Sequence, residues 1–229
     1  MWAQGARKTI HEISNDRFIG IPGNLPDIPN LQSKTYANFM IAAYGPNSLH
    51  DTVFRRVANM FAPYSLDESG LDIPLAVQTL KRTCARKYDC MRVLKTWVNS
   101  WFTSTRMHEA AKLPCLFGCQ DGVDNLSHYV ICPHLFTILT KLRDTPACPV
   151  KRLGLCAPTK DNLLAVACTF SGYHAVKRSP FVQSLTPSPL NCEQRLTALR
   201  LFADAFFVAA LEVGLSCKSC RTRHFSFDD

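Results

Sequence analysis

Hydrophobic side chains recur every three or four residues along much of the chain, which is the spacing of one face of an α-helix. Alternating hydrophobic and polar runs, which are typical of strands, are scarce, and no internal repeat is present. The pattern therefore predicts a mainly α-helical fold. The clearest stripe falls in residues 90–104 and consists of Leu94, Trp97, Val98, Trp101 and Phe102.

Capping residues indicate where several helices begin and end. Pro133 is expected to open a helix, because proline is well tolerated in the first turn. Asn191 with Gln194 three residues later is a variant of the capping box, and Gly214 is expected to end the helix that follows. Further helices are predicted over residues 34–44, 49–61, 73–88 and 161–177.

Interruptions of the helical pattern divide the chain into four predicted regions. Residues 1–33, rich in Pro and Gly, are expected to form an irregular N-terminal arm. They are followed by a helical basic region (34–112), then a Cys-rich segment with its following helix (113–145), and finally a C-terminal helical region (146–229). Inside the last region, the Ser- and Pro-rich segment 179–189 is expected to be a linker.

The Cys-rich segment has the ligand spacing of a small zinc knuckle. Gly118 lets the chain turn tightly between the first two cysteines, and Asp124 or Asn125 can cap a short helix. His128 and Cys132 are four residues apart, so both point from one face of that helix. Three thiols and one imidazole suit tetrahedral zinc in a closed, structural site. The ligands predicted for this site are Cys115, Cys119, His128 and Cys132.

Two other interpretations of the cysteines stay open. Because the chain contains 11 Cys, the spacing of the knuckle can arise by coincidence. A second, weaker metal candidate consists of Cys217, Cys220 and His224, with Cys192 or Asp228 as a fourth ligand. Free thiols near the end of the chain are the simpler interpretation of that group.

The number of cysteines and the hydropathy of the chain indicate the cellular compartment in which the protein is expected. The number of cysteines is odd, and the first residues contain no apolar signal core. Reduced thiols in an intracellular protein, nuclear or cytoplasmic, are therefore expected. The most apolar stretch, residues 196–215, contains Arg200, Asp204 and Glu212, so no membrane span is expected.

Positive charge is concentrated in one part of the chain. The formal net charge is +8, and the segment 81–112 contains eight basic residues against two acidic ones. Such a cluster indicates a polyanionic partner, and we expect contacts to the backbone of RNA or DNA. A solvated helical face is the alternative, and Trp97 and Trp101 are expected in the core rather than as stacking platforms. The basic residues are Lys81, Arg82, Arg86, Lys87, Arg92, Lys95, Arg106 and Lys112.

The run KTWVNSWFTSTRMHEAAKLPCLFGC…LSHYVICPHL resembles the region that follows the polymerase domain in non-LTR retroelement reverse transcriptases. There, a tryptophan-bearing basic helix precedes a Cys-Cys-His-Cys knuckle. The resemblance covers residues 75–140 and implies that the four knuckle residues bind the metal. It also implies a basic, aromatic stretch that contains Lys95, Trp97, Trp101 and Arg106. Many family members have four residues between the His and the last Cys, whereas this chain has three.

The motifs of the parent enzymes are missing. A reverse transcriptase needs an aromatic-x-Asp-Asp hairpin, and neither the sequence at 202–205 nor the one at 226–229 provides it. No endonuclease motif and no small-molecule substrate site is indicated. We therefore expect a nucleic-acid-binding accessory segment of a reverse transcriptase-like protein, without catalytic residues. The alternative is a non-catalytic helical scaffold or a degraded retroelement remnant.

Overall fold

The computed structural model describes residues 48–62, 70–83, 86–185 and 188–218. The chain divides into two units between Ser48 and Leu49, and the following description concerns the second unit. The predicted arm (1–33) and the predicted helix 34–44 lie outside the described residues.

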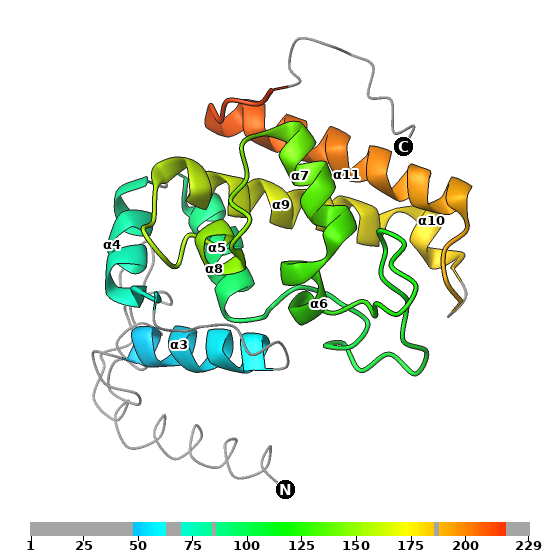
Figure 1. The fold of residues 1–229 in the computed structure, drawn as a ribbon, viewed down its shortest axis with the longest axis horizontal. Coiled ribbons are helices and arrows are strands. Elements are labelled where there is room, and N and C mark those ends of the chain that lie inside the picture. The colour runs from blue at the N-terminus through cyan, green and yellow to red at the C-terminus, as the bar shows by residue number, and fades with distance from the viewer. Residues whose placement is uncertain (1–47, 63–69, 84–85, 186–187, 219–229) are drawn as a thin grey trace, which may run out of the picture. The chain divides into compact units, whose positions relative to one another are not determined.

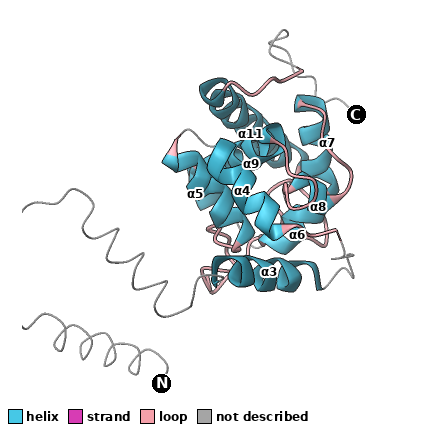
Figure 2. Cartoon of the chain, turned by 90° about the vertical axis from the view of Figure 1, so that its left-hand side faces the viewer, coloured by secondary structure: helices cyan, strands magenta, loops and turns pink. Residues whose placement is uncertain are grey.

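The described part of the chain is mainly helical, as the sequence predicts, and it contains no strand (Figures 1 and 2). An isolated antiparallel bridge joins Pro114 to Val123 in the Cys-rich segment. The helices are α3 (Ser48–Phe61), α4 (Ile73–Thr83), α5 (Lys87–Trp97), α6 (Leu126–Ile131), α7 (Pro133–Leu142), α8 (Pro149–Arg152), α9 (Lys160–Arg178), α10 (Pro180–Gln183) and α11 (Cys192–Val213).

Helix α9 lies at the centre of this arrangement. It packs along α11 and against α5, and it also contacts α4, α8 and α10 (Figure 1). Its first turn is capped by Thr159, whose hydroxyl accepts a hydrogen bond from the amide of Asn162 at 3.2 Å. Ten of its residues are buried, so both faces of the helix contribute to the core. A side chain on α9 is therefore held firmly enough to anchor other segments.

Several predicted helix ends are confirmed. Asn191 and Gln194 form a reciprocal capping box at the start of α11, and Gly214 ends this helix in the left-handed conformation with φ +67°. Pro133 is the first residue of α7. These ends depend on short-range backbone geometry, which explains why the sequence is sufficient to find them.

Other boundaries differ from the prediction. The predicted helix 73–88 is two helices, since α4 ends at Thr83 and α5 begins at Lys87. Helix α5 ends at Trp97 instead of continuing to residue 104, and Asn99 has a φ of +54°, which is incompatible with a continuing helix.

The stripe predicted over residues 90–104 is buried only in part. Trp97 and Trp101 are in the core, as expected, and their indole N–H groups donate to Leu153 O and Thr96 Oγ1. Phe102, in contrast, is 40% exposed. Trp101 therefore lies in the core although its backbone is irregular. Its spacing from Trp97 is that of one helix face, so the sequence resembles a continuing helix.

The first part of the segment predicted as a Ser- and Pro-rich linker is folded, and residues 186–187 lie outside the described residues. Its residues 180–183 form the short helix α10, and Val182 is buried. One hydrophobic core contains buried residues from α3 through α11. None of the helices in the described part of the chain combines the length and the hydrophobicity that a bilayer span requires.

Candidate metal centre

The four predicted ligands come from two neighbouring pieces of backbone. Cys115 and Cys119 lie on a tight turn that is closed by the hydrogen bond from Cys115 N to Gly122 O at 2.7 Å. His128 lies on α6, and Cys132 is the residue at which α6 ends and α7 begins. The turn and the α6–α7 junction therefore present their side chains to the same point.

The geometry of this group suits a single metal ion. The ligand atoms of the four residues all lie within 4.8 Å of one another. The Sγ atom of Cys132 is 3.8 Å from that of Cys115 and 3.5 Å from that of Cys119. Tetrahedral coordination with metal–sulfur bonds of about 2.3 Å places sulfur atoms roughly 3.8 Å apart. The Cys3His group can therefore hold a metal ion.

The histidine supplies an independent indication. Nε2 of His128 is buried and has no hydrogen-bond partner among the described residues. A buried imidazole nitrogen without a partner is costly, because it has lost its hydration. Coordination of a metal ion through Nε2 removes this cost, since the nitrogen lone pair is then used.

Hydrogen bonding within the cluster separates the pKa values of its three thiols. The pKa of the Cys119 thiol is lowered to about 2, chiefly by hydrogen bonding with the Cys115 and Cys132 thiols. The pKa of Cys115 is raised to about 12, and that of Cys132 is raised as well, chiefly because these two thiols keep their protons in the same hydrogen bonds. Backbone N–H groups of Phe117 and Leu135 approach the sulfurs of Cys115 and Cys132 at 3.4 Å. These donors stabilise thiolates, which are the forms that bind metals.

Two glycines are required by the turn. Gly118 has a φ of +88°, a conformation that residues with a side chain rarely adopt, and this confirms the predicted turn. At Gly122, a Cβ atom would lie 2.5 Å from His128 Nε2 and 2.9 Å from Cys115 Cβ. Any side chain at this position would therefore displace the imidazole from the cluster.

Asn125 and Asp124, both considered as helix caps in the sequence, have different roles. The Asn125 side chain caps α6 by accepting a hydrogen bond from His128 N at 2.6 Å. Asp124 is completely buried and binds groups outside its own segment. Its carboxylate accepts hydrogen bonds from Ser104 N (2.6 Å), Tyr129 Oη (2.8 Å), Tyr173 Oη (2.9 Å) and Lys177 Nζ (3.0 Å).

The predicted nucleic-acid-binding residues fall into two groups. Arg86 and Arg92 both bind the buried carboxylate of Asp89, at 2.7 Å and 3.1 Å. Arg86 also pairs with Glu212 on α11 at 3.4 Å. The charge of these two arginines is therefore used within the fold, and their first role is structural.

The other six basic residues form no ion pair within the described part of the chain. Lys95 is partly buried, with its ammonium 5.9 Å from the centre of the Phe170 ring. Nζ of Lys112 donates to two backbone carbonyls. Five of the six are exposed, namely Lys81, Arg82, Lys87, Arg106 and Lys112.

The second metal candidate falls largely outside the described residues. Cys217 is described and partly buried, whereas Cys220 and His224 are not described. Among the described residues, the Cys115, Cys119, His128 and Cys132 group is the one whose atoms converge for metal binding.

Comparison with protein-family models, with curated proteins and with solved structures finds no match to this chain.

Two features of the site were not found from the sequence. The role of Asp124 depends on Tyr173 and Lys177, which are about 50 residues away in the sequence, so no local pattern reveals it. The pairing of Asp89 with Arg86 and Arg92 has a local signal, since the three residues are spaced by three along the chain.

Proposed function

We propose that the Cys3His group binds one structural zinc ion. The proposal is supported by the sulfur–sulfur distances of 3.5 and 3.8 Å and by a ligand set that is complete without water. Zinc is favoured over harder ions such as Mg²⁺ because three of the four ligands are thiols. Elemental analysis of the purified chain should give about one zinc per molecule, and the Cys119→Ser variant should lose it.

We further propose that the chain is a nucleic-acid-binding accessory segment of a reverse transcriptase-like protein. The observation that carries this proposal is the exposure of Lys81, Arg82 and Lys87 without a carboxylate partner among the described residues. Unpaired exposed cations release counterions from a phosphate backbone when they bind it. Such contacts are insensitive to sequence, so the ligand is RNA or DNA of any sequence. The resemblance to reverse transcriptases favours structured RNA or an RNA–DNA hybrid among these.

The zinc site has a positioning role in this proposal. Arg106 and Lys112 are exposed on the loop that immediately precedes the first ligand. The backbone of this loop is fixed to the knuckle by the hydrogen bond from Ser104 N to Asp124. The metal thus orders the segment that holds these two cations.

A helical scaffold without binding activity is the second candidate function. It is favoured by the use of Arg86 and Arg92 inside the fold, which leaves fewer cations for a partner.

An RNA titration at two salt concentrations separates the two candidates. The test variant replaces Lys81, Arg82 and Lys87 by Gln. The control replaces three other exposed cations, Lys151, Lys160 and Arg200, by Gln, so that the net charge changes equally. The nucleic-acid proposal expects weaker binding and a smaller salt slope for the test variant alone, because fewer counterions are released from the phosphates. Equal effects of both variants, or no binding by wild type at low salt, favour the scaffold.

A further inference from the structure

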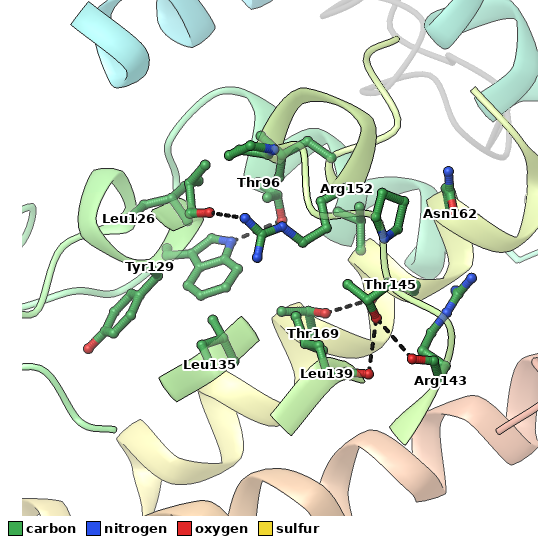
Figure 3. A pocket seen from close by; sticks show the side chains of 17 residues that line it. Thr96, Leu126, Tyr129, Leu135, Leu139, Arg143, Thr145, Arg152, Asn162 and Thr169 are labelled. Carbon is green, nitrogen blue, oxygen red and sulfur yellow. Dashed lines mark hydrogen bonds between the residues drawn. The ribbon is translucent and has the colours of Figure 1, made fainter. Parts of the chain in front are cut away.

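A pocket of about 50 Å³ is lined by residues of α6, α7 and α9 (Figure 3). Its walls are formed largely by hydrophobic side chains from several helices. They include Leu126 and Val130 of α6, Leu135 and Leu139 of α7, and Ala165 and Val166 of α9.

The hydroxyl groups in the pocket wall already have partners within the protein. Thr96 Oγ1 donates to Arg92 O and accepts a hydrogen bond from the indole of Trp101. Thr145 Oγ1 donates to Leu139 O, and Thr169 Oγ1 donates to Ala165 O (Figure 3). A water molecule inside the pocket would therefore find few groups to bind. The wall behaves as an apolar surface, which favours an apolar occupant.

Two arginines also line this wall. Arg143 donates to the carbonyls of Asp144 and Asp161 at 3.1 and 2.7 Å. Arg152 has fewer hydrogen-bond partners. Its guanidinium reaches into the pocket, where Nη2 donates to Val130 O at 2.8 Å (Figure 3). Its Nε and Nη1 have no acceptor within the described part of the chain, and no carboxylate there is within ion-pair distance. The guanidinium of Arg152 also lies over the Phe136 ring, with Cζ 4.6 Å from the ring centre. Burial lowers the pKa of Arg152, while the Cys148 and Cys132 thiols act in the opposite direction. A partly buried guanidinium with N–H groups that bind no protein acceptor favours an anionic ligand.

We propose that this pocket binds a compact aliphatic carboxylate, with the carboxylate on Arg152 and the branched apolar group against Ala165 and Val166. The size of the pocket restricts the apolar group. A cavity of roughly 150 Å³ is needed for a benzene ring, and one water molecule needs about 10–15 Å³. The volume of about 50 Å³ lies between these values and suits an isopropyl-sized group. This inference does not depend on the proposed nucleic-acid function.

The test is an NMR titration of the zinc-loaded full chain with isobutyrate and with its uncharged analogue isobutyramide. The proposal expects saturable binding of one isobutyrate and at least about tenfold weaker binding of the amide, because the charge-assisted hydrogen bonds to Arg152 are lost. N-acetylvaline is added as a third probe. Tighter binding of N-acetylvaline than of isobutyrate identifies a peptide carboxyl terminus as the source of the carboxylate, and weaker binding identifies a free acid.

Two variants locate the ligand. Ala165→Leu fills the pocket and should abolish binding, whereas Arg152→Gln should weaken isobutyrate about tenfold and leave isobutyramide unchanged. The control Arg200→Gln removes an exposed arginine on α11 that does not line the pocket, so it should bind as wild type. Absence of isobutyrate binding to wild type, equal binding of the amide, or full binding by folded Ala165→Leu overturns the proposal. The comparison of acid with amide uses wild type alone, so it is decisive even if a variant fails to fold.

Discussion

The ammonium of Lys177 lies 3.0 Å from the carboxylate of Asp124, and this ion pair joins the metal-binding segment to the central helix α9. The Asp124 side chain is fully buried, and that of Lys177 is 12% exposed. Tyr173, one turn earlier on α9, donates a second hydrogen bond to the same carboxylate. The knuckle is therefore attached to the helical core by charge as well as by packing.

Replacement of Asp124 by Asn should destabilise the fold by about 3 kcal/mol. The amide cannot neutralise Lys177, which then retains only the weaker pair with Glu109 at 3.4 Å. Chemical denaturation of the zinc-loaded proteins measures the difference. The control is Asp144→Asn, which removes an exposed pair with Lys218 and should have no measurable effect. Equal stabilities of Asp124→Asn and wild type would show that the ion pair does not hold the knuckle.

The Gly122→Ala variant should bind zinc at least about tenfold more weakly than wild type. The added Cβ would meet His128 Nε2 at 2.5 Å and push the ligand out of position. Competition with a chromophoric chelator measures the affinity. Gly214→Ala is the matched control, because its Cβ meets nothing within 4 Å and its strained φ of +67° affects only the end of α11. The explanation fails if both variants keep the zinc affinity of wild type.

Neutralisation of Arg92 should lower the stability of the fold, whereas neutralisation of Lys87 should lower its affinity for RNA. Arg92→Gln removes a hydrogen bond to the buried Asp89 carboxylate and should cost about 2 kcal/mol of stability without changing RNA affinity. Lys87→Gln removes an exposed charge and should weaken RNA binding without a measurable change in stability. Thermal unfolding and an RNA titration on the same two samples give both quantities. The division into structural and binding cations is wrong if the two variants behave alike.

Stability should fall in mild acid because of His174. Burial lowers the pKa of this histidine to about 4, and the nearby charges of Arg178 and Lys95 act in the same direction. In the unfolded chain the imidazole has a pKa of about 6.5, so between these values the unfolded state binds the extra proton. The free energy of unfolding should therefore decrease from pH 7 to pH 4.5, with about 2 kcal/mol due to His174.

Unfolding of wild type and His174→Phe at both pH values tests this contribution. The variant should lose about 2 kcal/mol less than wild type over this range, because phenylalanine does not titrate. His108→Phe, at an exposed position, is the control and should follow wild type. Identical pH dependence of wild type and His174→Phe would exclude the histidine as the cause.

The sequence was sufficient for features that depend on neighbouring residues. The capping box at Asn191, the glycine at the end of α11 and the four converging ligands all follow from short spacings. The helix ends near Thr83 and Trp97 were not predicted, because no Pro or Gly marks them. Trp101 is a second reason why the end of α5 was predicted too late. It is buried although it lies on irregular backbone, and its position continues the helical spacing of hydrophobic residues.

Features that join distant segments could not be predicted. Asp124 resembles a helix cap in the sequence, and its contacts with Tyr173 and Lys177 appear only after α9 is placed beside the knuckle. No local pattern distinguishes Arg152, and its position in the pocket depends on the packing of α8 against α9 and on its hydrogen bond to Val130 of α6. Such contacts depend on tertiary packing, which the periodicity of one segment does not specify.

We propose that zinc orders a segment whose exposed cations bind nucleic acid. The most direct test is the dissociation constant for a structured RNA, measured at low salt with zinc-loaded protein, with protein stripped by a chelator, and after zinc is restored. RNA binding should weaken when zinc is removed, because Arg106 and Lys112 lose their fixed positions, and it should recover when zinc returns. Equal affinity of the zinc-loaded and the stripped protein would contradict this proposal.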